Sequence, residues 1–112
     1  MLKTTQQPVG KNAKLRSAQK RIRVLFKKDR MGECKIVGER LFAQGVRDAD
    51  FLHLYGQTLK ACGNPKDALE KIFAAHEQEP ANANILNSLG LVFLDLRDTE
   101  TAIEMFKRAT SV

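Results

Sequence analysis

The chain has 112 residues, a formal net charge of +6, and 43% hydrophobic and 29% charged residues. This length suits one domain, and the composition is that of a globular protein rather than a disordered or fibrous chain. No apolar run is long enough to cross a bilayer, and the N-terminal residues lack the apolar core of a secretory signal. We therefore predict a single folded domain with a cytoplasmic location.

The charge is distributed unevenly along the chain. Residues 1–30 contain ten Lys or Arg residues and one Asp, a net charge of +9. Residues 31–112 contain nine Lys or Arg and twelve Asp or Glu, a net charge of −3. A basic N-terminal segment attached to a mildly acidic body indicates an acidic partner surface, nucleic acid or an anionic lipid surface.

Helical periodicity begins after a short irregular segment. Residues 1–12 contain Thr, Gln, Pro and Gly without periodicity and are predicted to be a disordered lead. Over residues 13–28, an apolar stripe recurs at helical spacing, and Lys and Arg fill the opposite side. Five further helices are predicted, separated by Gly, Pro and Asp/Asn turns, over residues 33–44, 50–61, 65–78, 83–95 and 99–112. The predicted N-caps are Asp48 or Asp50, Asn64, Asn82 and Asp98.

One pattern occurs twice, thirty-four residues apart. The first copy is Leu52, Tyr55, Gly56, Leu59, Ala68, Ile72, Ala75 and Pro80; the second is Leu86, Leu89, Gly90, Phe93, Ala102, Phe106 and Ala109. A helical pattern with this period indicates stacked helical hairpins. Because a glycine inside a helix costs about 0.5–1 kcal/mol relative to Ala, we predict that Gly56 and Gly90 permit close approach of the partner helix, through Ala68 and Ala102.

These residues resemble the tetratricopeptide repeat (TPR), a two-helix unit of this period. Units 49–82 and 83–112 match the pattern. Projecting the register back gives a degenerate unit, 15–48, in which Ile22 replaces the glycine and Val46 the proline. The resemblance implies an all-α fold, a right-handed α-solenoid of antiparallel helical hairpins with about six helices, occupying residues 13–112.

The repeat pattern stops within the last predicted helix. The family's terminal proline and its polar seventh helix are both missing. Since a helical array needs its end covered, we expect the chain to be a fragment of a longer protein or to cover its C-terminal end by self-association as a homo-oligomer.

Catalysis and metal binding have little support in the sequence. His53 and His76 fall on different predicted helices, no nucleophile is arranged with them, and no Cys or His cluster has metal-ligand spacing. Cys34 and Cys62 are predicted to be small buried residues, and His76 a solvated one. We therefore predict a non-enzymatic protein without a cofactor or a bound metal.

The family resemblance also implies a binding surface, because the first helix of each TPR hairpin lines a concave groove that holds a peptide. The ligand-binding residues predicted in this way are Arg16, Gln19, Lys20, Arg23 and Lys27 from the first unit, His53, Gln57 and Lys60 from the second, and Asn84, Asn87, Leu91 and Leu94 from the third. Arginines can bind carboxylates bidentately and lysines as point charges, whereas asparagines can bond a peptide backbone. We predict a protein-interaction module, a scaffold or adaptor, that binds an acidic or mixed acidic/apolar peptide.

Other interpretations stay open. The chaperone-binding subclass of the family is not expected, because Gln19, Leu54 and Ser88 occupy three of its carboxylate-clamp positions. The charges could merely solvate an outer face. The basic first helix could bind nucleic acid or an anionic surface, although Phe26 is its only aromatic residue. The repeats could also form the N-terminal domain of a larger enzyme, such as a sulfotransferase or glycosyltransferase.

Overall fold

The computed structural model describes residues 9–112, and side chains from Leu15 onward. Six helices follow one another: α1 (Val9–Lys27), α2 (Met31–Ala43), α3 (Ala49–Ala61), α4 (Pro65–Gln78), α5 (Ala83–Asp95) and α6 (Thr99–Ser111). These residues contain no strand, which confirms the predicted all-α class. No helix in the described part of the chain is both long and apolar enough to span a membrane.

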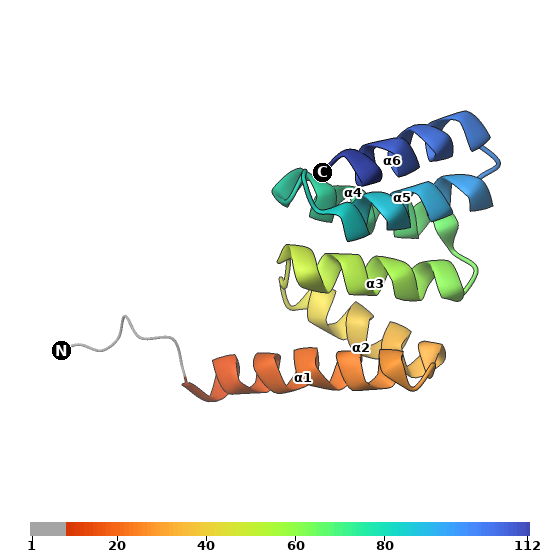
Figure 1. The fold of residues 1–112 in the computed structure, drawn as a ribbon. Coiled ribbons are helices and arrows are strands. Elements are labelled where there is room, and N and C mark those ends of the chain that lie inside the picture. Colours follow the sequence, from red (N-terminus) through yellow and green to blue (C-terminus); the bar gives the residue numbers. More distant parts are fainter. Residues whose placement is uncertain (1–8) are drawn as a thin grey trace.

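The helices form three antiparallel hairpins arranged in a row, and the first helices of the hairpins, α1, α3 and α5, lie one above another (Figure 1). The principal extents of the molecule are 57 × 28 × 20 Å and its radius of gyration is 15.7 Å. A compact domain of this length would have a radius of gyration of about 13 Å. The elongation is that of stacked hairpins, in which each unit contacts only its neighbours, and it confirms the predicted solenoid of hairpins.

The first helix is longer than predicted. It begins at Val9, four residues before the predicted start at residue 13. Most of the predicted disordered lead, residues 1–8, lies outside the described residues. Gly10 lowers helix propensity by about 1 kcal/mol relative to Ala, but no proline interrupts the segment after Val9, so the helix can extend through it.

Three of the predicted side-chain caps form. Asp48 Oδ2 accepts a hydrogen bond from the Phe51 N–H at 3.1 Å, and Asn82 and Asp98 cap α5 and α6 in the same way. Asn64 occupies the predicted N-cap position of α4, but its side chain makes no capping hydrogen bond. The proline that follows Asn64 has no N–H, which removes one of the donors that would need a partner at this helix start.

Within the second and third hairpins, the paired helices are in tight contact at a glycine. A Cβ added to Gly56 would overlap the Ile72 side chain and lie 3.2 Å from the Ala68 carbonyl oxygen, which confirms the predicted close approach. At Gly90 the nearest atoms all belong to the Phe106 ring, not to Ala102 as predicted. An aromatic side chain at the position of Ile72 reaches farther across the interface and replaces the backbone as the nearest neighbour.

The first two units join through aromatic residues. Gly38 of α2 faces the Tyr55 ring of α3, where a Cβ would overlap the ring. The Tyr55 ring stacks on the Phe51 ring of the same helix, with 5.5 Å between their centroids. The Phe42 ring of α2 also contacts Tyr55, with 5.9 Å between the two ring centroids. Both α3 aromatics are buried, so this junction is part of the core.

Replacing a glycine of the interface should destabilise the fold. In Gly56→Ala the added methyl group must displace Ile72 from a close-packed position, which should lower the free energy of unfolding by about 1–3 kcal/mol. Gly32→Ala in α2 is the matched control, because no atom lies within 4 Å of the added Cβ; it should be neutral or stabilise by up to about 1 kcal/mol. Urea unfolding followed by circular dichroism measures both, and equal stabilities for the two variants would contradict this account of the interface.

Candidate functional site

The predicted ligand-binding residues all lie on α1, α3 and α5, and we call this surface the first-helix face. Its members are Arg16, Gln19, Lys20, Arg23, Lys27, His53, Gln57, Lys60, Asn84, Asn87, Leu91 and Leu94. The α1 and α5 members are exposed except for Gln19, which is half-buried, as are the three α3 members. Four of them have side-chain partners within the chain: Gln19, Arg23, His53 and Lys60.

Two of the predicted residues on α1 connect it to the start of α3. Gln19 Nε2 donates a hydrogen bond to Asp48 Oδ1 at 3.0 Å, and the Arg23 guanidinium forms an ion pair with the Asp50 carboxylate. The Arg23 and Asp50 side chains are 55% and 60% exposed, so this pair contributes at most about 1 kcal/mol to stability. Its larger consequence is that Arg23 is already neutralised and is not an unpaired cation of the surface.

Two of the predicted residues on α3 connect it to α5. His53 Nε2 lies 2.7 Å from Ser88 Oγ, at hydrogen-bonding distance, and Lys60 Nζ lies 3.3 Å from Asp95 Oδ2. Burial disfavours the imidazolium and lowers the pKa of His53 below its ordinary value, only partly offset by the Glu79 carboxylate. The polar groups of α3 therefore hold neighbouring units together.

Exposed groups remain at the two ends of the first-helix face. Arg16, Lys20 and Lys27 form what we call the α1 cation patch, and no ion pair involves them among residues 15–112. Asn84, Asn87, Leu91 and Leu94 form what we call the α5 leucine patch; Leu91 and Leu94 are 47% and 42% exposed. The two patches are carried by α1 and α5, and α3 lies between these two helices (Figure 1).

Sequence reasoning missed the polar side chains that pair with the predicted residues. They are Asp48, Asp50, Ser88 and Asp95, each about one repeat length after its partner. That spacing is a usable signal, because residues one repeat apart lie on adjacent first helices. A polar residue on one first helix and a second polar residue 27 to 35 residues later are therefore candidates for a contact between units.

The cysteines and His76 do not form a reactive site. Cys34 is buried as predicted and its Sγ lies 3.7 Å from the Ile22 carbonyl oxygen, whereas Cys62 is only half-buried. Burial raises the pKa of the Cys34 thiol and so disfavours the reactive thiolate. His76 was predicted to be solvated but is half-buried, with an Nδ1 atom that lacks a partner in the described structure. Among the residues that the structure describes, no group of three His, Cys, Asp or Glu side chains could hold a metal ion.

Known structures share this fold although sequence comparison finds nothing. No protein-family model matches the chain, and no curated protein matches it significantly. MamA (41-end) from Desulfovibrio magneticus RS-1 superposes with a TM-score of 0.79 at 21% identity, covering 87% of this chain and 55% of that one. The chain thus spans about half the length of the MamA structure.

Two further structures resemble most of the chain. PcrH in complex with the chaperone binding region of PopB gives a TM-score of 0.78 at 14% identity, covering 88% of this chain and 80% of that one. The type III secretion translocator chaperone SycD of Yersinia enterocolitica gives a TM-score of 0.77 at 12% identity, covering 89% of this chain and 75% of that one. At these identities the likeness concerns the fold alone, which is that of TPR-like helical-repeat proteins.

Lowering the pH should weaken the fold through His53. Because the pKa of His53 is lowered in the folded state, the unfolded chain binds a proton first as the pH falls below about 6.5. The stabilising contribution of neutral His53 is therefore present above this pH and is lost as the pH falls toward the folded-state pKa. His53→Gln should flatten the dependence of Tm on pH between roughly 7.5 and 5.5.

Asn87→Gln, one repeat later and not titratable, should leave that dependence unchanged. Identical slopes in wild type and His53→Gln would contradict the assignment.

Proposed function

We propose that this chain is a non-enzymatic interaction module that binds a peptide segment carrying both carboxylates and apolar side chains. The observation that carries this proposal is the presence of unpaired exposed cations on α1 and of exposed leucines on α5, both on the first-helix face. The α1 cation patch favours carboxylates, and the α5 leucine patch favours apolar side chains. The asparagines of the α5 patch can bond the peptide backbone.

The spacing of the two patches defines the peptide further. Packed helices are about 8–10 Å apart, so α1 and α5 are separated by about 16–20 Å across α3. An extended chain covers that distance with about five or six residues. We therefore propose a segment whose acidic residues precede or follow its apolar residues by roughly that number of positions.

The structural neighbours support a protein-binding role. PcrH carries this fold and was solved with the chaperone binding region of PopB, and SycD is described as a translocator chaperone. Both are proteins whose described role is to bind another protein. Their low identity means that the peptide proposed for this chain depends on its own residues, not on theirs.

The alternatives gain no specific support. Phe26, the aromatic that could stack on a base, is partly buried against the core, so α1 offers cations without a free aromatic surface. Self-association through the C-terminal end stays a proposal, consistent with Ile103, which is 47% exposed on α6. An origin as the repeat domain of a larger enzyme, and the cytoplasmic location, also stay predictions.

Selection from a library of random 12-residue peptides displayed on phage tests the proposal. Enriched peptides should combine Asp or Glu with Leu, Ile or Phe, and their affinity should fall steeply with added salt. The double variants Lys20→Glu/Lys27→Glu and Leu91→Ser/Leu94→Ser should each weaken binding about tenfold or more. Neither should lower the Tm appreciably, because all four side chains are exposed.

The matched control is Lys107→Glu, which reverses an exposed cation on α6, away from the first-helix face. It should leave peptide affinity within about twofold of wild type. If the two double variants bound the selected peptides as tightly as this control does, the first-helix face would not be the binding site.

A further inference from the structure

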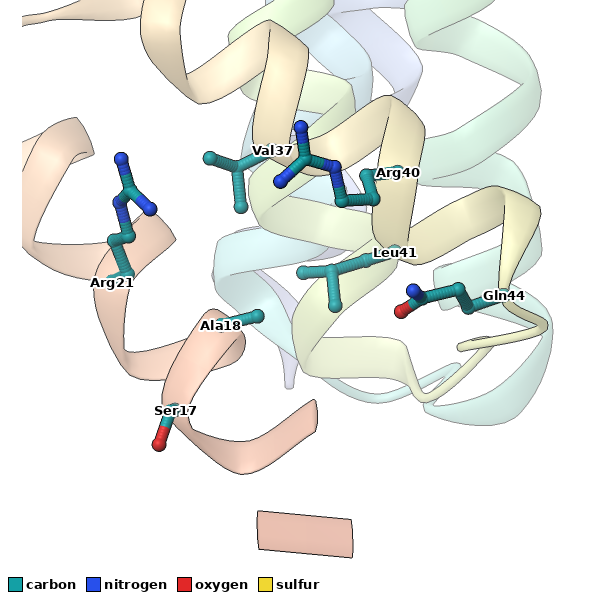
Figure 2. Close-up of a pocket in the computed structure, with 7 residues that line it drawn as sticks. All are labelled: Ser17, Ala18, Arg21, Val37, Arg40, Leu41 and Gln44. Carbon is teal, nitrogen blue, oxygen red and sulfur yellow. The ribbon is translucent and has the colours of Figure 1, made fainter. Parts of the chain in front are cut away.

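A hollow of about 460 Å³ opens between α1 and α2, outside the first-helix face (Figure 2). Its apolar lining consists of Ala18 from α1 and Val37 and Leu41 from α2. Arg21 and Arg40 lie on opposite sides of the opening, one on each helix, as Figure 2 shows. Ser17 and Gln44 complete the lining. None of these residues was predicted to bind a ligand.

The hollow exists because the first unit departs from the repeat. Ala18 stands one and two repeats before Leu52 and Leu86, which are 2% and 1% exposed and fill the core of their hairpins. Ile22 stands where Gly56 and Gly90 allow close approach, so α1 contacts α2 less extensively than α3 contacts α4. A small residue in place of a large one, between helices held apart by Ile22, leaves the space unfilled.

The equivalent surface one repeat later is occupied by the chain itself. Tyr55, Lys71 and Gln78 follow Arg21, Val37 and Gln44 by one repeat. The Phe42 ring of α2 lies against that surface, 5.9 Å from the Tyr55 ring and 4.6 Å from Lys71 Nζ. In addition, Gln78 Nε2 donates a 2.6 Å hydrogen bond to the carbonyl oxygen of Arg47, just after α2. The second unit thus receives the end of a helix, with its aromatic side chain and the backbone that follows.

The charges around the hollow indicate which kind of segment would fit it. Arg21 and Arg40 are exposed, and neither forms an ion pair within residues 15–112. A carboxylate between two guanidinium groups would relieve their mutual repulsion and accept charge-assisted hydrogen bonds from both. The occupant is therefore an acidic segment with a large apolar side chain.

A second copy of this chain fits that description poorly. In a head-to-tail array the end of α6 would approach the hollow in place of α2. The residue one repeat after His76 and two after Phe42 is Thr110, which is too small to replace an aromatic ring. The same turn of α6 carries Lys107 and Arg108, which would face two arginines of like charge.

We propose that the hollow is a docking site for the end of an acidic amphipathic helix from a partner protein. The helix inserts an aromatic side chain onto Ala18, Val37 and Leu41. Its carboxylate pairs with Arg21 and Arg40, and a backbone carbonyl oxygen after its last turn accepts a hydrogen bond from Gln44. This site is separate from the first-helix face and does not depend on the function proposed for that face.

A peptide derived from the chain's own α2 segment provides the probe. It has the sequence of residues 35–49, with Lys35, Arg40 and Arg47 replaced by Glu and Gly38 by Ala to favour the helix. Methyl NMR of the full chain should show shifts at Val37 and Leu41 on titration. A second peptide, which also carries Phe42→Ala, should bind about tenfold more weakly.

Variants of the protein separate this site from the first-helix face. Ala18→Leu restores the side chain found at Leu52 and Leu86, so it should fill the hollow and abolish peptide binding while keeping or raising the Tm. Arg21→Glu should weaken binding about tenfold. Leu91→Ser, in the α5 leucine patch, should leave the titration of the Val37 and Leu41 methyl shifts unchanged, because that readout reports only on the hollow.

Three results would overturn the proposal. One is the absence of methyl shifts in the wild-type chain up to about 1 mM peptide. Another is equal affinity for wild type and Ala18→Leu. The third is concentration-dependent self-association, seen in sedimentation and abolished by Ala18→Leu, which would assign the hollow to a second copy of the chain.

Discussion

The structure depends on the close approach of the two helices within the second and third hairpins. Gly56 and Gly90 give up helix propensity so that Ile72 and Phe106 can lie against the opposing backbone. This contact sets how each hairpin presents its outer surface to the next one. Between the first two units, the Tyr55 ring packs on Gly38 in a similar way.

The first unit relaxes this constraint, and both candidate binding surfaces include it. Ile22 holds α1 away from α2, and Ala18 leaves a space that Leu52 fills one repeat later. In addition, Arg21 takes the register position of Tyr55, so a position that is buried in the second unit becomes polar and exposed in the first. This departure from the repeat at one end of the chain, with cations in place of apolar residues, is consistent with the two proposed binding surfaces.

The middle of the first-helix face has a different role. His53 and Lys60 contact Ser88 and Asp95, so α3 contributes its polar side chains to the junctions between units. A ligand that crosses this face therefore meets paired groups at its centre and unpaired groups only at its ends. Specificity should come from the ends, because displacing Lys60 from Asp95 would cost a ligand part of what it gains there.

Local signals predicted much of the fold. The bounds of α4 and α5 agree with the sequence-based ranges, because Gly63, Pro65 and Asn82 act on the residues beside them. The glycines of the repeat also predicted close helix contacts. The candidate site was less predictable. Pairing of Arg23 with Asp50 depends on how one hairpin is placed on the next, and the hollow at Ala18 depends on the volume of a side chain that is missing.

The most direct test of peptide binding by the first-helix face is a backbone amide NMR titration of the full chain with a peptide that carries carboxylates at one end and leucines at the other. We predict shifts centred on Lys20 and Lys27 of α1 and on Leu91 and Leu94 of α5. Shifts confined to α4 and α6 would contradict the proposed binding face.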